Sequence, residues 1–429
     1  MSNESKSRAV PEENKMGVMP VGRLLFSMSL PMMLSMLVQA LYNIVDSIFV
    51  AKLSEDALSA VSLAFPLQTL IFAVGGGTCV GVNALLSRAL GEKDFKKAND
   101  VAMNGAFLTV LSYVVFLILG LTVVKPFYVG QLNGTSSPIY GMGVDYLSTV
   151  MIFSIGVFCQ MYFERLLTST GKTVYTMLSQ LTGAVINIIL DPIFIFAFHM
   201  GVKGAALATI LSQAISTIWV VRFLCGNKTQ IHLRRKYMRL QPKVFLPCVA
   251  LGLAAFIMQA SESIVAVCFN SSLLRYGGDI AVGTMTILTS VMQFAMLPLQ
   301  GIAQGSQPIS SYNYGAQNAD RVKKTFRLLV ITCLTYSVIF WIIVQLIPKV
   351  FVSLFTSDGA LVAFAAPMLR IYMGGMLLFG IQIACQMTFT SLGRAVNSIV
   401  VAVVRKFVLL IPLIYIIPHA VSNPTVGVY

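Results

Sequence analysis

The feature that most constrains this chain is a series of long apolar runs that recurs from one end of the sequence to the other. A run of roughly 18 apolar residues is long enough to cross the hydrocarbon core of a bilayer as an α-helix. Inside lipid, a helix satisfies its backbone hydrogen-bonding groups within itself. Hydrophobic residues make up 57% of the chain and charged residues only 11%. We therefore predict an all-α, polytopic membrane protein.

Charged breaks between the apolar runs delimit eleven predicted helices. The first half contains six of them, at 23–49, 57–87, 101–124, 140–168, 173–198 and 201–222. The second half contains five, at 245–271, 280–310, 325–347, 361–390 and 395–419. Residues 1–22 are polar and mixed in charge, and we expect a disordered cytoplasmic tail there.

The 30 Lys and Arg residues are distributed unevenly between the two sides of the membrane. Most fall in one set of alternate loops that begins with the tail, whereas the opposite loops hold only Lys52, Lys125, Lys203, Arg275 and Lys349. An excess of Lys and Arg marks cytoplasmic loops, so a cytoplasmic N-terminus is predicted. The basic run 234–243 is then a loop beside anionic lipid, and we expect no nucleic-acid partner.

Three pairs of similar segments indicate an internal duplication. "SRALGEKDFKKA" (87–98) resembles "SYNYGAQNADRVKKT" (311–325), and "TSTGKTVYT" (168–176) resembles "TSLGRAVNS" (390–398). A fainter likeness relates "VKGAA" (202–206) to "TVGVY" (425–429). The corresponding glycines keep one nearly constant offset along the chain: Gly91 with Gly315, Gly171 with Gly393, and Gly204 with Gly427.

The duplication predicts two six-helix lobes of the same orientation, related by an axis along the membrane normal. The first lobe covers residues 23–222, a basic cytoplasmic linker covers 223–244, and the second lobe covers 245–429. Only five helices are found in the second lobe. We expect the copy of the sixth helix, which would be the twelfth of the fold, to be missing from this chain.

Motifs for catalysis and for ATP-driven transport are absent from the sequence. "TSTGKT" (168–173) is not a phosphate-binding loop, because Leu166 stands where the first glycine is needed. The sequence has no HExxH or GxSxG motif, its 3 histidines are scattered, and none of its 7 cysteines has a metal or redox spacing. We expect a protein that is not an enzyme, holds no cofactor or metal centre, and draws its energy from an ion gradient.

Three acidic residues lie well inside predicted spans: Asp46, Asp191 and Glu262. A carboxylate at the bilayer centre is costly, so such residues commonly mark ion or proton pathways. Asn187 is four residues before Asp191 and shares its helix face, and Pro192 removes a backbone donor beside them. The alternative is that each acid lies near an interface or pairs structurally with an arginine.

Several segments carry a resemblance to a known family. "SLPMMLSMLVQALYNIVDSIFVAKL", "ALSAVSLAFPLQ", "NIILDPIFIF", "GVKGAALAT" and "GIAQGSQPISSYNYGA" resemble the multidrug and toxic compound extrusion (MATE) family, in the right order along the chain. The likeness is closest to the DinF-like and MepA-like bacterial branch. This resemblance implies two six-helix lobes around a central cleft. It also implies efflux of cationic, often aromatic compounds across the bacterial inner or plasma membrane in exchange for H⁺ or Na⁺.

The resemblance also assigns candidate site residues. The polar cluster of the first lobe in the DinF-like branch matches Asp46, Asn187, Asp191 and Thr209, which would bind the proton or Na⁺. Pro31 matches a proline at which the first helix bends, and Gln39 and Tyr42 match polar positions that face the same cavity. Glu262 resembles an acid of the NorM branch, but the predicted helix 361–390 contains no second Asp or Glu.

We therefore expect a monomeric antiporter of small organic cations in the lipid bilayer. A cation site in the first lobe would couple ion exchange to drug binding in the cleft. The alternative within related folds is a flippase for lipid-linked oligosaccharides, which would need several Arg or Lys in the cleft. Apart from the residues counted with the tail and loops, four basic residues lie in predicted spans, mostly near helix ends: Arg165, Arg370, Arg405 and Lys406. A channel and a membrane-embedded enzyme are the alternatives from other classes.

Overall fold

The computed structural model describes residues 14–132, 134–224, 226, 242–421 and 423–429. These residues are almost entirely helical and include no strand, which confirms the all-α prediction. Residues 1–13 of the predicted tail, and residues 225 and 227–241 of the predicted linker, lie outside the described part of the chain.

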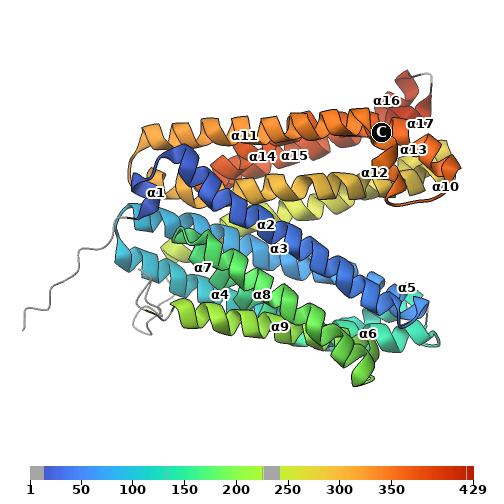
Figure 1. The fold of residues 1–429 in the computed structure, drawn as a ribbon, viewed down its shortest axis with the longest axis horizontal. Coiled ribbons are helices and arrows are strands. Elements are labelled where there is room, and N and C mark those ends of the chain that lie inside the picture. The colour runs from blue at the N-terminus through green and yellow to red at the C-terminus, as the bar shows by residue number, and fades with distance from the viewer. Residues whose placement is uncertain (1–13, 133, 225, 227–241, 422) are drawn as a thin grey trace, which may run out of the picture.

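The helices of the first half form the lower bundle in Figure 1, coloured blue to green. Short side chains mark where helices begin: Ser54 Oγ accepts the N–H of Ala57 at 3.0 Å, and Asp94 Oδ1 accepts that of Lys97 at 2.9 Å. The elements are α1 (Lys15–Val18), α2 (Val21–Ala51), α3 (Glu55–Gly91), α4 (Phe95–Thr122), α5 (Val124–Leu132), α6 (Pro138–Ile152), α7 (Ile155–Ser169), α8 (Thr173–Pro192), the π-helical turn η1 (Ile193–Ala197) and α9 (Gly201–Leu224).

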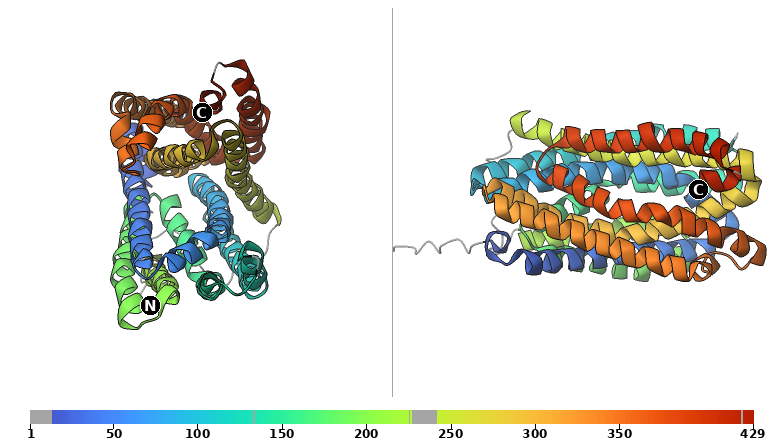
Figure 2. Two further views of the ribbon diagram at one scale, coloured as in Figure 1. Left: turned by 90° about the vertical axis from the view of Figure 1, so that its right-hand side faces the viewer. Right: turned by 90° about the horizontal axis from the view of Figure 1, so that it is seen from above.

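The helices of the second half form the upper bundle, coloured yellow to red, and the end-on view in Figure 2 shows the same two groups. α10 (Pro242–Gly315) consists of two helices joined at Gly278, whose φ of 63° is the left-handed conformation that glycine tolerates. The other elements are α11 (Ala319–Leu346), α12 (Pro348–Ser353), α13 (Gly359–Tyr372), the 3₁₀ turn η3 (Met373–Gly375), α14 (Met376–Ser391), α15 (Ala395–Val403), the π-helical segment η4 (Val404–Leu410), α16 (Ile411–Ala420) and α17 (Pro424–Val428).

Ten of the eleven predicted spans correspond to apolar helices of the structure. Nine described helices are long and apolar enough to cross a membrane, and α6 with α7, bent by 43°, makes a tenth span. The predicted span at 245–271 lies within the first part of α10 and is helical throughout, and it contains the shorter apolar helix Phe245–Met258. Ser261 and Glu262 interrupt the apolar run beyond that point.

The end of the predicted tail is ordered, so the expectation of disorder is wrong for residues 14–22. Met16 in α1 is fully buried. Its backbone carbonyl accepts a hydrogen bond from Arg321 Nη2 at 3.0 Å, and the carbonyl of Met19 accepts one from the same atom at 2.7 Å. The sequence did not reveal this order because the partner, Arg321, lies far along the chain in α11.

The two bundles repeat the same irregularities at nearly one offset. The short helix after the third span is α5 in the first half and α12 in the second. These two helices begin at Val124 and Pro348, which keep the same offset as Gly91 and Gly315. The next span is broken in both halves, between α6 and α7 and at η3 between α13 and α14. These correspondences agree with the internal duplication predicted from the sequence.

Glycines at equivalent positions let the two bundles approach closely. A Cβ added to Gly81 of α3 would lie 2.5 Å from the carbonyl oxygen of Cys248 in α10. A Cβ added to Gly305 of α10 would lie 2.6 Å from Cα of Ser29 in α2. Gly81 and Gly305 are related by the offset of the repeat, so each bundle provides the small residue at one of two symmetric helix crossings.

A hydrogen bond joins the two halves at their centre. Asn83 Nδ2 donates to Gln307 Oε1 at 2.8 Å, and both side chains are fully buried. The two residues are also related by the offset of the repeat. Two residues at equivalent positions of a repeat touch each other directly only near the axis that relates the copies. This pair therefore lies at the pseudo-two-fold axis.

Candidate functional site

A buried polar cluster lies between α8 and α9. Asn187 Nδ2 donates to Asp191 Oδ1 at 3.1 Å and to Thr209 Oγ1 at 3.4 Å. Asp191 is fully buried and Asn187 is 1% exposed. α8 ends at Pro192 and continues as the π-helical turn η1, a type of irregularity that recurs at functional sites.

α2 adds Asp46 to this cluster, because it packs along α8. The carboxyl groups of Asp46 and Asp191 are close enough for their charges to interact. Both charges also act on the hydroxyl group of Tyr42. The structure therefore brings together all four residues predicted for the cation site: Asp46, Asn187, Asp191 and Thr209.

The cluster contains more acceptors than donors. Asp46 Oδ1, Asn187 Oδ1 and Asp191 Oδ2 are buried and accept no hydrogen bond from the described residues. Buried oxygen atoms without a donor are expensive, because they have lost water and gained nothing in return. A proton or a small cation would supply the missing positive partner, so the chemistry of the cluster fits such a ligand.

A small cavity of about 100 Å³ adjoins the cluster. Gln39 and Tyr42, the two cavity residues predicted from α2, both line it together with Asn187 and Thr209. Pro31 does not: it is buried between Ser29 and Met33, the residues at which α2 meets α10, and α2 runs through it without a break. The structure thus places Pro31 at the crossing of the bundles and outside the lining of the cavity.

Glu164 of α7 is a lining residue that the sequence reasoning missed. It is 5% exposed and accepts hydrogen bonds from Gln160 Nε2 at 3.1 Å, Ser179 Oγ at 3.0 Å and Gln180 Nε2 at 2.9 Å. Its position beside Arg165, near the end of a predicted helix, is typical of a pair at the membrane interface. Gln160 could have indicated that Glu164 faces the interior, because it lies one turn earlier on the same face of an apolar helix.

A larger cavity of about 340 Å³ lies between the bundles. Residues of α3, α7, α10, α14, α15 and η4 line it. Phe72, Met258, Met296 and Phe379 provide apolar surface, and Glu262 is the acidic residue of the lining.

Basic residues also line this cavity, whereas the sequence indicated only that most basic residues of the predicted spans are near helix ends. Arg165, Arg405 and Lys406 are all part of the lining. Arg370 is not: its Nε donates to the carbonyl oxygen of Gln345, where α13 meets α11. Helix packing directs the first three inward, and the sequence alone does not report that.

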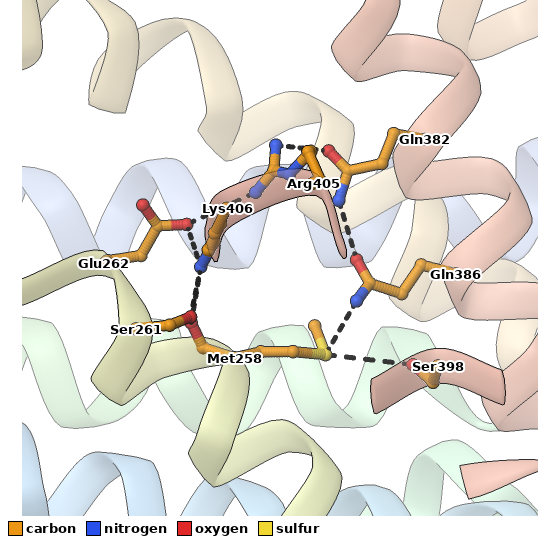
Figure 3. Close-up of polar contacts among 8 residues, drawn as sticks. All are labelled: Met258, Ser261, Glu262, Gln382, Gln386, Ser398, Arg405 and Lys406. Atoms are coloured by element: carbon orange, nitrogen blue, oxygen red, sulfur yellow. Dashed lines mark hydrogen bonds and ion pairs between the residues drawn. The ribbon is translucent and has the colours of Figure 1, made fainter. Parts of the chain in front are cut away.

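Glu262 pairs with basic residues within the second bundle, as Figure 3 shows. Its Oε1 is 2.6 Å from Lys406 Nζ and 3.6 Å from Arg405 Nη2. Arg405 Nη1 also donates to Gln382 Oε1 at 2.6 Å. The structural alternative considered for this acid, pairing with an arginine, is therefore present, and Lys406 is the closer partner.

Two bundles of apolar helices around buried charged cavities define this chain as a multi-pass membrane transporter. A family model described as MatE matches residues 31–193 and again residues 254–416. The chain belongs to the MatE family, and the double match agrees with the internal repeat.

Relatives in sequence are the multidrug export protein MepA of several staphylococci. The Staphylococcus saprophyticus protein is 25% identical over 389 residues, which cover 90% of this chain and 85% of that protein. The Staphylococcus haemolyticus protein is 27% identical over 392 residues, covering 91% and 85%. These relatives are named as export proteins, so the prediction that the chain is not an enzyme is confirmed.

Solved transporter structures share the fold. The outward-facing structure of a multidrug resistance MATE family transporter superimposes with a TM-score of 0.90 at 23% identity, covering 98% of this chain and 93% of that one. A transporter of the MOP superfamily from Pyrococcus furiosus gives a TM-score of 0.91 at 22% identity, covering 98% and 94%.

Proposed function

We propose that this chain is a multidrug exporter that uses a gradient of H⁺ or Na⁺ to expel organic cations across the bacterial cell membrane. It would act as a monomer with a cytoplasmic N-terminus. One observation carries the coupling part of the proposal. Three buried oxygen atoms of the Asp46 cluster lack a donor, and a proton or a Na⁺ ion is the ligand that satisfies them.

α2 connects the ion site to the crossing of the two bundles. Asp46 and Tyr42 belong to its second half, which faces α8. Ser29 and Met33 of its first half contact Gly305 and Gly301 of α10. Filling or emptying the ion site changes the electrostatic balance between α2 and α8. Because the same helix forms the crossing of the bundles, that change biases one arrangement of the lobes over the other.

The larger cavity suits the drug. Its volume of about 340 Å³ falls within the range, roughly 300–1,000 Å³, of small-molecule pockets. Aromatic rings and methionines accommodate varied organic bodies. Glu262 is the acid of this lining, and its side chain is 61% exposed.

The test is efflux of ethidium, a fluorescent organic cation, from vesicles in which a pH gradient and a Na⁺ gradient are imposed separately. Asp191→Asn should abolish gradient-driven efflux and leave ethidium binding in place, because the ion site and the drug cavity are separate. Asp145→Asn is the matched control, since Asp145 is an acid of α6 outside both cavities. Gradient-driven efflux by Asp191→Asn at the wild-type rate would contradict the proposal.

A second candidate is the flippase of lipid-linked oligosaccharides, and one observation favours it. Arg165, Arg405 and Lys406 line the larger cavity with Glu262 as its acid, so the described lining carries an excess of positive charge. Such a lining suits a pyrophosphate group. Arg165→Gln distinguishes the two candidates. In an exporter of cations it removes a positive charge that repels ethidium, so the affinity for ethidium should rise. In a flippase it should instead weaken binding of a pyrophosphate-bearing lipid.

A further inference from the structure

Three oxygen atoms surround the ammonium group of Lys406. Its Nζ is 2.6 Å from Glu262 Oε1, 2.7 Å from the Met258 carbonyl oxygen and 2.7 Å from Ser261 Oγ. An ammonium group has three N–H donors, and each of them has an acceptor here. Lys406 is 2% exposed, so this charge is held inside the protein (Figure 3).

All three oxygen atoms come from adjoining residues of one helix. Met258, Ser261 and Glu262 belong to α10, within about one turn of each other. Lys406 reaches them from η4, where the π-helical winding replaces regular α-helix. The neighbouring Arg405 is held elsewhere, by Gln382 at 2.6 Å and over the ring of Phe379, and approaches Glu262 Oε1 only to 3.6 Å.

We propose that the Lys406 ammonium is a built-in cation, which occupies a monovalent-cation site formed by Glu262, Ser261 and the Met258 carbonyl. Carboxylate, hydroxyl and carbonyl oxygen atoms inside a bundle are a donor set suited to Na⁺. The side chain fills that position permanently. Arg405 adds a second positive charge beside the single carboxylate, so a free cation is repelled as well as excluded.

This inference goes beyond the proposed function, because it concerns the second bundle and not the Asp46 cluster. It follows that the second bundle does not exchange a coupling ion. Lys406 is the residue that prevents Na⁺ from binding there, and its removal should leave an open cation site at Glu262. If Lys406 only held η4 against α10, its removal would not create a site that binds Na⁺.

Lys406→Ala in the 429-residue chain tests this. Thermal unfolding of the purified variant is compared in NaCl and in choline chloride, whose cation is too large for the site. Na⁺ should raise the Tm of Lys406→Ala by more than it raises that of the wild type. The extra rise should vanish in Lys406→Ala/Glu262→Gln. Lys349→Ala, which removes an exposed lysine of α12, is the matched control and should behave as the wild type.

An equal effect of Na⁺ on Lys406→Ala and the wild type would overturn the inference, as would an extra rise that survives Glu262→Gln. The same comparison in an Asp191→Asn background keeps the test separate from the proposed function, because the extra rise should persist there. If Lys406→Ala does not fold, binding of radioactive Na⁺ to the wild type and to Glu262→Gln decides. Equal binding supports a site already filled by Lys406, and loss of a bound Na⁺ in Glu262→Gln refutes it.

Discussion

Replacing Gly81 with alanine should weaken the crossing of α3 with α10, where the two bundles meet. The added Cβ would lie 2.5 Å from the carbonyl oxygen of Cys248. Carbon and oxygen atoms in the closest ordinary contacts are about 3.3–3.6 Å apart, so the two helices must separate by about 1 Å. The atom that blocks the way is backbone, which cannot rotate aside.

The size of the effect follows from two opposing contributions. Overpacking of a well-packed contact costs about 1–3 kcal/mol, whereas alanine in place of glycine inside a helix gains about 1 kcal/mol. Gly76→Ala isolates the second contribution, because its Cβ would meet only Met161 Cε, at 3.6 Å. Both glycines belong to α3, so the difference between the two variants is the overpacking cost, about 1–3 kcal/mol.

Thermal unfolding in detergent, followed by the accessibility of buried cysteines to a thiol-reactive dye, measures both variants side by side. Gly76→Ala should unfold at or above the wild-type temperature, and Gly81→Ala below it. If the two variants unfold together, the bundles separate without cost at this crossing. In that case the close approach of Gly81 to Cys248 contributes nothing to the stability of the protein.

Three further predictions concern individual polar side chains and their partners. Removing one partner of the buried pair Asn83–Gln307 leaves one atom of the other amide without its hydrogen bond and should cost about 1–3 kcal/mol; a double-mutant cycle to leucine should give a coupling energy clearly above zero. Glu164→Leu leaves three donors unpaired and should lower the Tm further than Glu164→Gln, as thermal unfolding would report. At the membrane surface, burial raises the pKa of Glu92, but hydrogen bonds from Lys97 and Arg88 outweigh it and hold the pKa below its ordinary 4.5. This contribution is complete above pH 4.5 and fades as the pH falls through the lowered pKa, so Glu92→Gln should flatten stability in that acidic range.

The sequence predicted the features that depend on neighbouring residues. Apolar runs located ten of the helices found here. In lipid each run must satisfy its own backbone hydrogen bonds, so its helical structure depends on that run by itself. The pairing of Asn187 with Asp191 followed from helical spacing, and the hydrogen bond between them is 3.1 Å long. The offset between the repeats was also readable, because both copies keep the same turn residues.

Other residues could not be placed from the sequence, because their environment is built by helices far apart in the chain. Glu164 resembled an interface residue until donors from α8 enclosed it. Lys406 was a basic residue inside a predicted apolar helix without a partner, until α10, from the start of the second bundle, provided its acceptors.

The sequence by itself determined that this chain crosses a membrane as helices, that its two halves are copies, and that Asp46, Asp191 and Glu262 lie inside apolar spans. Those properties follow from the free energy of each segment in its solvent. Only the tertiary structure decided which charges meet: Asp46 with Asp191 in one bundle, and Glu262 with Lys406 in the other. Electrostatic interaction depends on the distance between groups and on the water excluded from around them. Both are set by how the helices pack, which no single segment encodes.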